Sequence, residues 1–280
     1  MFDLFNQTDD DDAEVSESVN MDRFMLEKKL EDYFFDDLEI YFKTRFFEKV
    51  CHREAWAIES GFAALPQELR RVAFHHAVLT NHAKTLKAFL RAARNIKADI
   101  NTDFDTFPKR ISPLMMACFH ECRRSFLTLV EDGKADLSVC DDQGHSLARA
   151  CVHTKNLGFM KWAQRYGVVF DVNDPVDALI PLAAEYGSFS VLRWLIEDLG
   201  GDVNITDKCD YSALNYALYK DKDIFLYLVD KGAKMTGKYE VLFGFIIDQI
   251  RELQKQPPSE MIDRRIDHQI ETLRFLMNKA

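Results

Sequence analysis

A short pattern recurs along the middle of this chain at an almost constant interval. The stretch Ser112-Pro113-Leu114-Met115-Met116-Ala117-Cys118 has counterparts that begin at 146, 180 and 212. The small residue inside each copy is Ala117, Ala150, Ala183 or Ala217, so the steps are 33, 33 and 34 residues. A fainter copy at 74–77 lies 40 residues before Ala117. A fixed period of this length predicts stacked repeats, each of which buries its apolar face against the next.

Each copy continues with a second apolar run and then a glycine. The runs are 126–130 before Gly133, 159–163 before Gly167, 191–196 before Gly200 and 225–229 before Gly232. Glycine readily takes the left-handed conformation that ends a helix, and a small alanine lets paired helices approach closely. The unit is therefore predicted to be helix, turn, helix, glycine stop and extended loop.

This pattern resembles the ankyrin repeat, whose signature is Thr-Pro-Leu-His-x-Ala-Ala, a Val-Val-x-Leu-Leu helix and Gly-Ala-Asp-x-Asn. About five units are present, at 70–106, 110–140, 141–173, 174–206 and 207–237, and 207–214 follows the signature best. The first unit lacks the Thr-Pro start and has an extended loop at 95–110. The resemblance implies an all-α ankyrin-repeat solenoid of stacked helix-turn-helix units, with short hairpin loops and helical caps at both ends.

Residues 21–69 are expected to form the N-terminal helical cap. Leu30, Phe34, Leu38, Phe42 and Phe46 recur at every fourth residue, so this segment has one broad apolar face to bury. Residues 70–237 are then the repeat array.

Residues 238–280 are expected to form the C-terminal helical cap. Its first helix, 239–254, would turn five apolar side chains inward, and Pro257-Pro258 would end it. Ser259 would cap a last helix. The five inward residues are Leu242, Phe245, Ile246, Ile250 and Leu253.

The formal net charge of −10 is concentrated at one end of the chain. Residues 1–20 carry seven acidic side chains and no basic one, which leaves 36 basic against 39 acidic residues from Met21 onward. We expect 1–20 to be a disordered tail, either simply solvated or used for recruitment. Without a clustered Lys and Arg stripe, nucleic acid is not an expected partner.

No signal directs this chain to a membrane or through one. The N-terminus lacks a basic start and a long apolar stretch, and no span approaches eighteen apolar residues. Six cysteines are thinly spread, unlike a disulfide framework. We expect a cytoplasmic protein in a reducing compartment, monomeric in isolation.

Two groups of residues suggest a metal site, and both are better explained by packing. Cys118, His120 and Cys122, followed by Cys151 and His153, are zinc-ligand types, but the chain has no Cys-x-x-Cys pair. Cys118 and Cys151 also occupy a small-residue position of the repeat, where free cysteine packs well. No metal is predicted.

The histidine cluster His75, His76 and His82 has spacings of one and six, which do not place two ligands on one helix face. His75 falls where the ankyrin signature has its own histidine, and the resemblance implies a structural role that ties a turn to the helix.

Residues 65–69 resemble the start of an F-box, but the first repeat occupies the space that such a module needs, and Pro66 fits the first turn of a helix. No phosphate loop, Gly-x-Ser-x-Gly elbow, His-Glu-x-x-His or Cys-His nucleophile pattern is present. The sequence therefore predicts no enzyme and no cofactor.

The resemblance also implies where a partner would bind. In the family, contacts come from hairpin tips and from the exposed positions just after the small residues of the first helix. Aromatic side chains at such positions can serve as binding anchors, although some can instead pack against neighbouring repeats. Carried over by position, the predicted contacts are Phe119, His120, Val152, His153, Glu185, Tyr186, Tyr219 and Lys220, with Tyr211 in the last hairpin.

The leading functional prediction is a non-catalytic adaptor that binds a partner protein through the concave face of the array. Two alternatives remain open: a bacterial or viral effector, delivered into a host cell to intercept a host protein, and a regulator or subunit of an enzyme. Replacing Tyr186 and Tyr219 with alanine should weaken binding, whereas Trp194→Ala should unfold the array.

Overall fold

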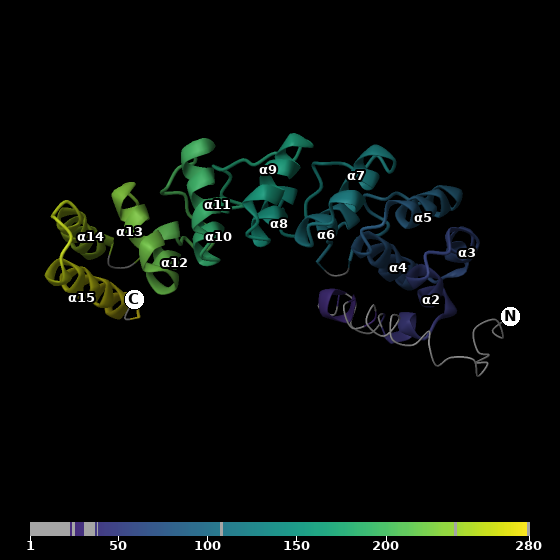
Figure 1. Cartoon of the computed structure of the whole chain (residues 1–280), viewed down its shortest axis with the longest axis horizontal. Helices are drawn as coiled ribbons and strands as arrows, with labels where there is room; N and C mark the ends of the chain where they lie inside the picture. Colours follow the sequence, from purple (N-terminus) through teal and green to yellow (C-terminus); the bar gives the residue numbers. More distant parts are fainter. Residues whose placement is uncertain are drawn as a thin grey trace. The chain divides into compact units, whose positions relative to one another are not determined.

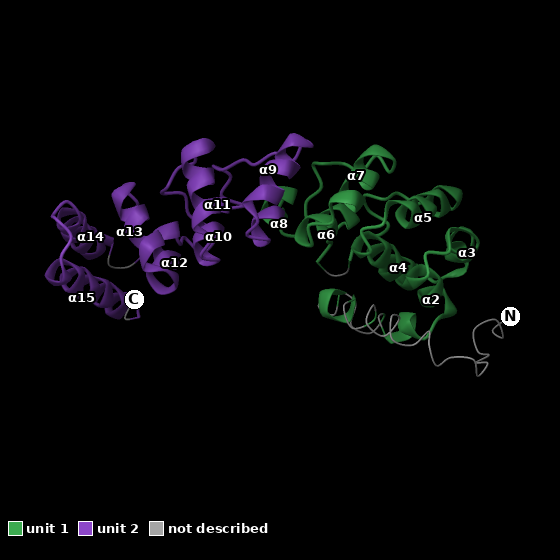
Figure 2. Cartoon of the chain, viewed as in Figure 1, with its two compact units in different colours: residues 1–150 green, residues 151–280 purple. Residues whose placement is uncertain are grey.

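The computed structural model describes residues 23, 26–30, 37, 39–106, 109–237 and 240–278. The chain divides into two compact units, Met1–Ala150 (unit 1) and Cys151–Ala280 (unit 2), and the boundary falls inside α8 (Leu147–His153), as Figure 1 and Figure 2 show. The described residues form helices and no β-strand, apart from an isolated bridge between Thr206 and Ser212. The all-α prediction is confirmed.

Unit 1 is built from successive helix pairs. They are α2 (Arg45–Cys51) with α3 (Ala55–Gly61), α4 (Gln67–Leu79) with α5 (Ala83–Asn95), and α6 (Pro113–Phe119) with α7 (Arg123–Glu131). A 3₁₀ turn, η1 (Phe62–Ala64), links the first two pairs. Because α4 packs on α6 and α5 packs on α7, first and second helices form separate layers.

Unit 2 continues the same order of elements. It contains α9 (Leu157–Arg165), α10 (Leu179–Glu185), α11 (Phe189–Arg193) with its π-helical extension η2 (Trp194–Asp198), α12 (Ala213–Lys220) and α13 (Lys222–Asp230). The helices α14 (Glu240–Gln254) and α15 (Glu260–Met277) complete the unit. α12 packs against both α10 and α15, and α13 packs against α14, so the last two helices cover the repeat that precedes them.

The turns inside the first five helix pairs each contain one left-handed residue, whereas Asp221 between α12 and α13 has φ of −152°. Arg53, Asn81, Glu121 and Lys155 have φ of 58°, 49°, 54° and 59°, and Gly187 has φ of 66°. This conformation is uncommon outside glycine, so its recurrence at equivalent turns marks one repeated backbone design. Arg53 shows that α2 and α3 already follow this design, within the segment that the sequence predicted to be a plain cap.

Three of the four glycines predicted to end a helix have the expected left-handed backbone conformation. Gly167, Gly200 and Gly232 have positive φ. At Gly133 the left-handed residue is instead the following Lys134, and glycine is required for another reason. A Cβ on Gly133 would lie 2.5 Å from the Leu129 carbonyl oxygen, so only glycine fits against the end of α7.

Short hairpins between repeats are organised by an aspartate. Asp141 Oδ1 accepts hydrogen bonds from the backbone N–H groups of Gln143 and His145, at 2.9 and 2.8 Å. Asp207 repeats this arrangement two repeats later and accepts from the N–H of Tyr211 at 3.0 Å. An aspartate that bonds its own backbone in this way fixes a tight turn without a β-sheet.

An asparagine in the extended loop joins one repeat to the next. In each case Oδ1 accepts a hydrogen bond from a backbone N–H of the following loop, which leaves that donor satisfied in the absence of a sheet. The pairs are Asn101 with Asp136, Asn173 with Asp202 and Asn204 with Lys234, at 2.9, 2.9 and 2.8 Å.

The structural role predicted for His75 is confirmed. Its ring is fully buried, and Nε2 lies 2.8 Å from the carbonyl oxygen of Phe104, so Nε2 carries the hydrogen and donates. Burial lowers the pKa of His75 to about 4, which keeps the ring neutral at pH 7. Asn215 holds the equivalent position in the last repeat and donates from Nδ2 to the Thr236 carbonyl oxygen at 3.0 Å.

The expected inward face of the first C-terminal cap helix is wrong at two positions. Leu242 and Phe245 are 41% and 63% exposed. The segment 241–247 is apolar on nearly every side, so periodicity alone could not choose among its faces. The side chains that are buried instead follow one stripe: Phe243, Ile246, Ile247, Ile250 and Leu253.

The N-terminal apolar stripe is buried where the structure describes it, except at Phe42, which is half-buried. Leu30 and Phe46 are buried, and so are Tyr41 and Phe47 beside them. Residues 34 and 38 of the predicted stripe, and the whole acidic segment 1–20, lie outside the described residues.

Candidate partner-binding surface

The last residue of α8 and the residue that ends α10 form a side-chain pair. Tyr186 Oη lies 2.6 Å from His153 Nε2, and the two ring centroids are 4.7 Å apart. Lys155 Nζ lies 5.3 Å from the centre of the Tyr186 ring, within reach of a cation–π contact. His153 is exposed and Tyr186 is half-buried, so the pair presents an aromatic surface with a positive charge beside it.

Further tyrosines lie on and beside α12. Tyr211 and Tyr219 are 43% and 47% exposed. Tyr211 meets the ring of Tyr216 edge-on, at a centroid distance of 5.9 Å. Tyr216 donates its hydroxyl hydrogen to Asp207 Oδ2. The pKa of Tyr216 is raised mainly by burial and secondly by this hydrogen bond. The phenol therefore stays protonated and fixed to the hairpin.

Electrostatic contacts connect these residues. The Glu185 carboxylate at the end of α10 contributes to the raised pKa of Tyr216, after burial and Asp207. The pKa of Tyr219 is also raised, mainly by burial, and Tyr211 adds to this increase. We use the name tyrosine face for the surface of unit 2 formed by His153, Tyr186, Tyr211, Tyr216 and Tyr219.

Val152 does not belong to an accessible surface, contrary to the sequence prediction. Its side chain is 1% exposed, whereas the next residue, His153, is exposed. Consecutive residues of an α-helix point about 100° apart, so Val152 can face the core while His153 faces solvent. Val152 is part of the core.

The other predicted contacts lie at helix ends. Phe119 is the last residue of α6, and both it and His120 are half-buried in unit 1. Burial, and to a lesser extent the charge of Lys29, lowers the pKa of His120 to about 4, so the ring is neutral at pH 7. In unit 2, Glu185 is half-buried and Lys220 is exposed.

Tyr219 is less free than the repeat pattern implied. Its hydroxyl lies 3.4 Å from the Arg274 carbonyl oxygen and 3.2 Å from Asn278 Oδ1, at the end of α15. Its ring is nevertheless 47% exposed, so Tyr219 both attaches the C-terminal helix and contributes to the tyrosine face.

A second aromatic surface was missed by the sequence argument. On α9, Trp162 stacks on Phe159 at 5.5 Å and contacts Tyr166 at 4.8 Å. Tyr166 and the nearby Val169 are 44% and 77% exposed. The signal was available, because Trp162 and Tyr166 are four residues apart on a second helix and so share one face.

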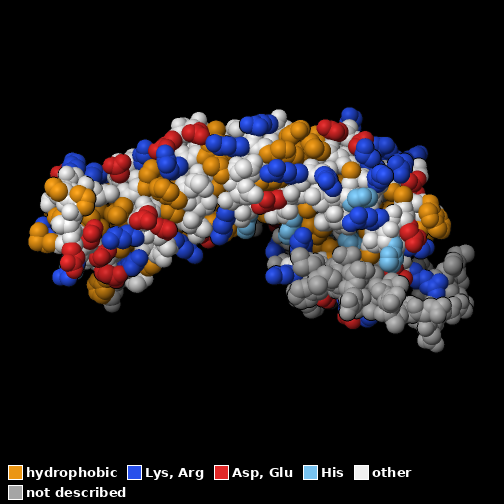
Figure 3. Space-filling view, in the orientation of Figure 1, with side chains coloured by type: hydrophobic (Ala, Val, Ile, Leu, Met, Phe, Trp, Pro, Cys, Tyr) orange, Lys and Arg blue, Asp and Glu red, His pale blue; other side chains and the backbone are white. Residues whose placement is uncertain are grey.

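The structure also contains a basic stripe that the sequence argument overlooked. Lys84, Lys87, Arg91 and Arg94 follow one face of α5, and Lys and Arg side chains gather over α5 and α7 in Figure 3. Carboxylates neutralise part of it: Lys87 Nζ lies 3.1 Å from Asp132 Oδ2, and Arg91 donates to Glu59 at 2.8 Å. Such exposed pairs contribute little to stability.

The cysteines that suggested zinc are packed in the core. Cys118, Cys122 and Cys151 are buried, and burial raises the pKa of the Cys122 thiol to about 11, whereas zinc binds the thiolate. Within the described ranges, no three Cys, His, Asp or Glu side chains are grouped so that they could hold a metal ion. The helices in those ranges are all too short or too polar to span a bilayer.

Comparison with known families agrees with this architecture. Residues 147–239 match the family model described as ankyrin repeats, in three copies, and these correspond to the last three units predicted from the sequence. No curated protein matches the chain. The matched repeats, together with the helix pairs and hairpins described above, support an ankyrin-repeat architecture, and residues 147–239 are the part of the chain that the family model covers.

Proposed function

We propose that this chain is a non-catalytic adaptor that binds a partner protein through the tyrosine face. Ankyrin repeats are generally protein–protein interaction modules, which supports the class of function. The observation that carries the choice of surface is the exposure of Tyr211 and Tyr219, at 43% and 47%, beside the half-buried Tyr186.

Tyrosine suits this role for physical reasons. Its ring offers a large contact area with only two side-chain torsions to immobilise, and its hydroxyl can hydrogen bond at the edge of an interface. The rings of Tyr186 and Tyr216 are already oriented by His153 and Asp207. A surface ordered before binding loses less entropy when the partner arrives.

The cysteines support a reducing compartment as the place of action. None of the six cysteines, all of which are described, forms a disulfide, and Cys140 and Cys209 are exposed. Exposed free thiols are at risk of oxidation outside such a compartment. We therefore place the adaptor in the cytoplasm.

The test is a pull-down from lysate with mass spectrometry, using the intact protein and a Tyr186→Ala/Tyr211→Ala double variant. The captured partner is then titrated against both proteins by calorimetry. We expect the double variant to bind at least about tenfold more weakly, because interface aromatics are typical anchors. Tyr166→Ala is the matched control, since Tyr166 is as exposed as Tyr211 but follows the last residue of α9, outside the tyrosine face.

The opposite result would assign binding elsewhere. If Tyr166→Ala abolishes binding and the double variant does not, the partner uses the α9 surface. Circular dichroism and the thermal midpoint of each variant establish that a loss of binding is not a loss of folding.

A further inference from the structure

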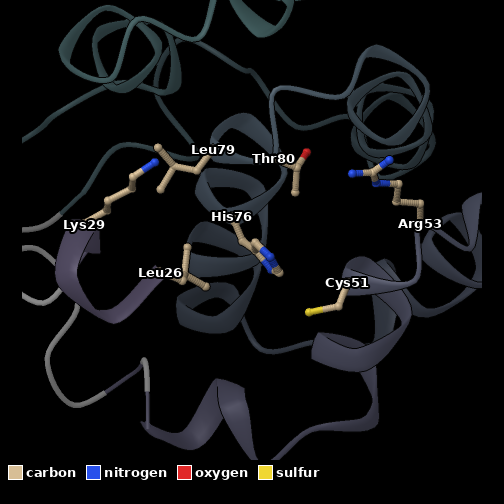
Figure 4. Close-up of a pocket in the computed structure, with 7 residues that line it drawn as sticks. All are labelled: Leu26, Lys29, Cys51, Arg53, His76, Leu79 and Thr80. Atoms are coloured by element: carbon tan, nitrogen blue, oxygen red, sulfur yellow. The ribbon is translucent and has the colours of Figure 1, made fainter. Parts of the chain in front are cut away.

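A small pocket in unit 1 lies where the N-terminal helical residues meet the first two helix pairs. Its volume is about 190 Å³. It combines cationic, imidazole, thiol and aliphatic groups, as Figure 4 shows. The lining residues are Leu26, Lys29, Cys51, Arg53, His76, Leu79 and Thr80.

Two cations border this pocket, and no carboxylate among the described residues neutralises them. Lys29 and Arg53 lie on opposite sides, with the imidazole of His76 between them (Figure 4). Within the described part of the chain, neither forms an ion pair, whereas Lys87 and Arg91 of α5 do. An unpaired cation at a pocket is available to an incoming anion.

The positive field extends beyond the two side chains. Burial and then the charge of Lys29 lower the pKa of His120 to about 4. Burial and then the charge of Arg53 lower the pKa of His82. Each cation is therefore close enough to act on a second group of unit 1, and together they make the pocket electropositive.

His76 supplies a neutral hydrogen-bond donor. It is 4% exposed, and burial lowers its pKa to about 3, so the ring is uncharged at pH 7. Its Nδ1 lies 3.0 Å from Oη of Tyr41, a fully buried phenol with no second hydrogen-bond acceptor among the described residues. Donation from Tyr41 to Nδ1 satisfies that phenol and leaves the hydrogen on Nε2 of His76.

The Thr80 hydroxyl is already used, because Oγ1 donates to the Ala77 carbonyl oxygen at 2.7 Å. Anion contacts in the pocket therefore come from Lys29, Arg53 and His76. Leu26 and Leu79 provide the apolar part of the lining.

We propose that this pocket binds the phosphate group of a phosphorylated side chain on a bound peptide. A phosphomonoester carries about −1.5 to −2 charge at pH 7, which two cations balance, whereas a single carboxylate leaves one cation unbalanced. Arginine and lysine are the usual phosphate ligands, and the leucines would contact the carbon portion of the side chain. The choice of a peptide as the source rests on the proposed protein-binding function.

The first test is ligand-observed saturation-transfer NMR on the full chain, with phospho-L-tyrosine and L-tyrosine as probes. We expect phosphotyrosine to bind and tyrosine not to bind. A Lys29→Gln/Arg53→Asn double variant should lower the phosphotyrosine affinity at least about tenfold, since hydrogen bonds to charged groups are the strong ones. Asparagine is chosen because it tolerates the left-handed backbone of Arg53, where φ is 58°.

The matched control is Lys28→Gln/Lys97→Asn. It removes the same charge, and Lys97 has φ of 57°, almost the same as Arg53. Lys28 is exposed and neither residue lines the pocket. If this control weakens binding as much as the test variant, the effect is general electrostatics and the pocket proposal is wrong.

The thiol of Cys51 reports whether the ligand occupies the pocket. We expect phosphotyrosine to slow iodoacetamide alkylation of Cys51, measured by peptide mass spectrometry, without slowing that of the exposed Cys140 and Cys209. Equal rates at Cys51 with and without a bound probe would place the ligand elsewhere and overturn the proposal.

Competitors separate the possible sources of the anion. If inorganic phosphate binds as tightly as phosphotyrosine, the pocket takes free phosphate and the peptide source is wrong. If an unphosphorylated peptide of residues 1–20, with its seven acidic side chains, binds as tightly, selectivity for phosphate is wrong. The Tyr186→Ala/Tyr211→Ala variant should bind phosphotyrosine normally, so failure at the pocket and failure at the tyrosine face are distinguishable.

Discussion

Tyr186 and His153 are 33 residues apart in the chain, yet the Tyr186 hydroxyl lies 2.6 Å from His153 Nε2. Each residue stands at the end of the first helix of its repeat, so one repeat orients the half-buried ring of the next. Repetition of the fold thus produces an ordered aromatic surface from residues that are not needed in the core.

Replacing Tyr186 should separate the contribution of its ring from that of its hydroxyl. We expect Tyr186→Ala to weaken partner binding at least about tenfold, equivalent to about 1.4 kcal/mol. Tyr186→Phe keeps the ring area and loses only the bond to His153, so it should weaken binding less. Calorimetric titration of the captured partner measures both effects. An unchanged affinity in Tyr186→Ala would remove this residue from the interface.

Truncating an aromatic side chain should cost more stability in the core than on the tyrosine face. Trp194 is 4% exposed and meets Phe170 edge-on at 5.1 Å, so Trp194→Ala should cost about 3–5 kcal/mol. Tyr219→Ala loses an exposed ring and weak bonds to α15, and should cost about 1 kcal/mol. Urea denaturation compares the two variants. If Tyr219→Ala destabilises the protein as much as Trp194→Ala, the Tyr219 ring is part of the core.

The repeat period predicted the helix pairs because spacing alone determines which residues of successive units are equivalent. It placed Trp194 in the core and gave His75 its structural role, and both predictions are confirmed. The separate prediction for the C-terminal cap, made from its apolar pattern, failed at Leu242 and Phe245, where an all-apolar stretch has no unique inward face until α13 is packed against it.

The candidate sites were less predictable for a different reason. A position in the repeat signature fixes where a residue lies on the backbone but not which residues its side chain contacts. The burial of Val152 and the attachment of Tyr219 to α15 could therefore not be predicted. The pocket between Lys29, Arg53 and His76 depends on how the N-terminal residues fold back on the first repeat, and no periodic pattern encodes that contact.

A buried and an exposed asparagine of the last repeats should contribute differently to the free energy of unfolding. Asn215 is 3% exposed, donates to the Thr236 carbonyl oxygen, and accepts from the Ser212 hydroxyl at 2.7 Å. Asn215→Ala removes the acceptor of the buried Ser212 backbone N–H and the donor to the Thr236 carbonyl oxygen, and should cost about 2–3 kcal/mol. Asn204→Ala removes one bond to Lys234 in an exposed loop, where water can replace it, and should cost less than about 1 kcal/mol. Urea midpoints that fall equally in the two variants would contradict this ranking.

Acid should destabilise unit 1 through its buried histidines. Burial lowers the pKa values of His75, His76 and His120 to about 4, 3 and 4, from an ordinary value near 6.5. The unfolded chain therefore binds protons at a higher pH than the folded chain, and the stability present above pH 6.5 is lost as the pH falls toward 4. Burial raises the pKa of Asp105 to about 6, and this carboxyl has the opposite effect over the same interval. The three histidines together should change the free energy of unfolding more than the one carboxyl does, so the net effect of acid is destabilising.

The last prediction is that unit 1 loses stability between pH 7 and pH 5 and that His75→Asn reduces this loss. Asparagine cannot be protonated there, and Asn215 shows that it can donate the same kind of hydrogen bond at the equivalent position. A fully buried histidine with a pKa near 4 contributes on the order of 3 kcal/mol across the whole transition, so the slope should change measurably. Hydrogen-exchange mass spectrometry at matched intrinsic exchange, on peptides from 67–95 and 213–230, follows the two units separately. The same pH dependence in His75→Asn and in the unmodified protein would show that His75 is not a source of the acid sensitivity.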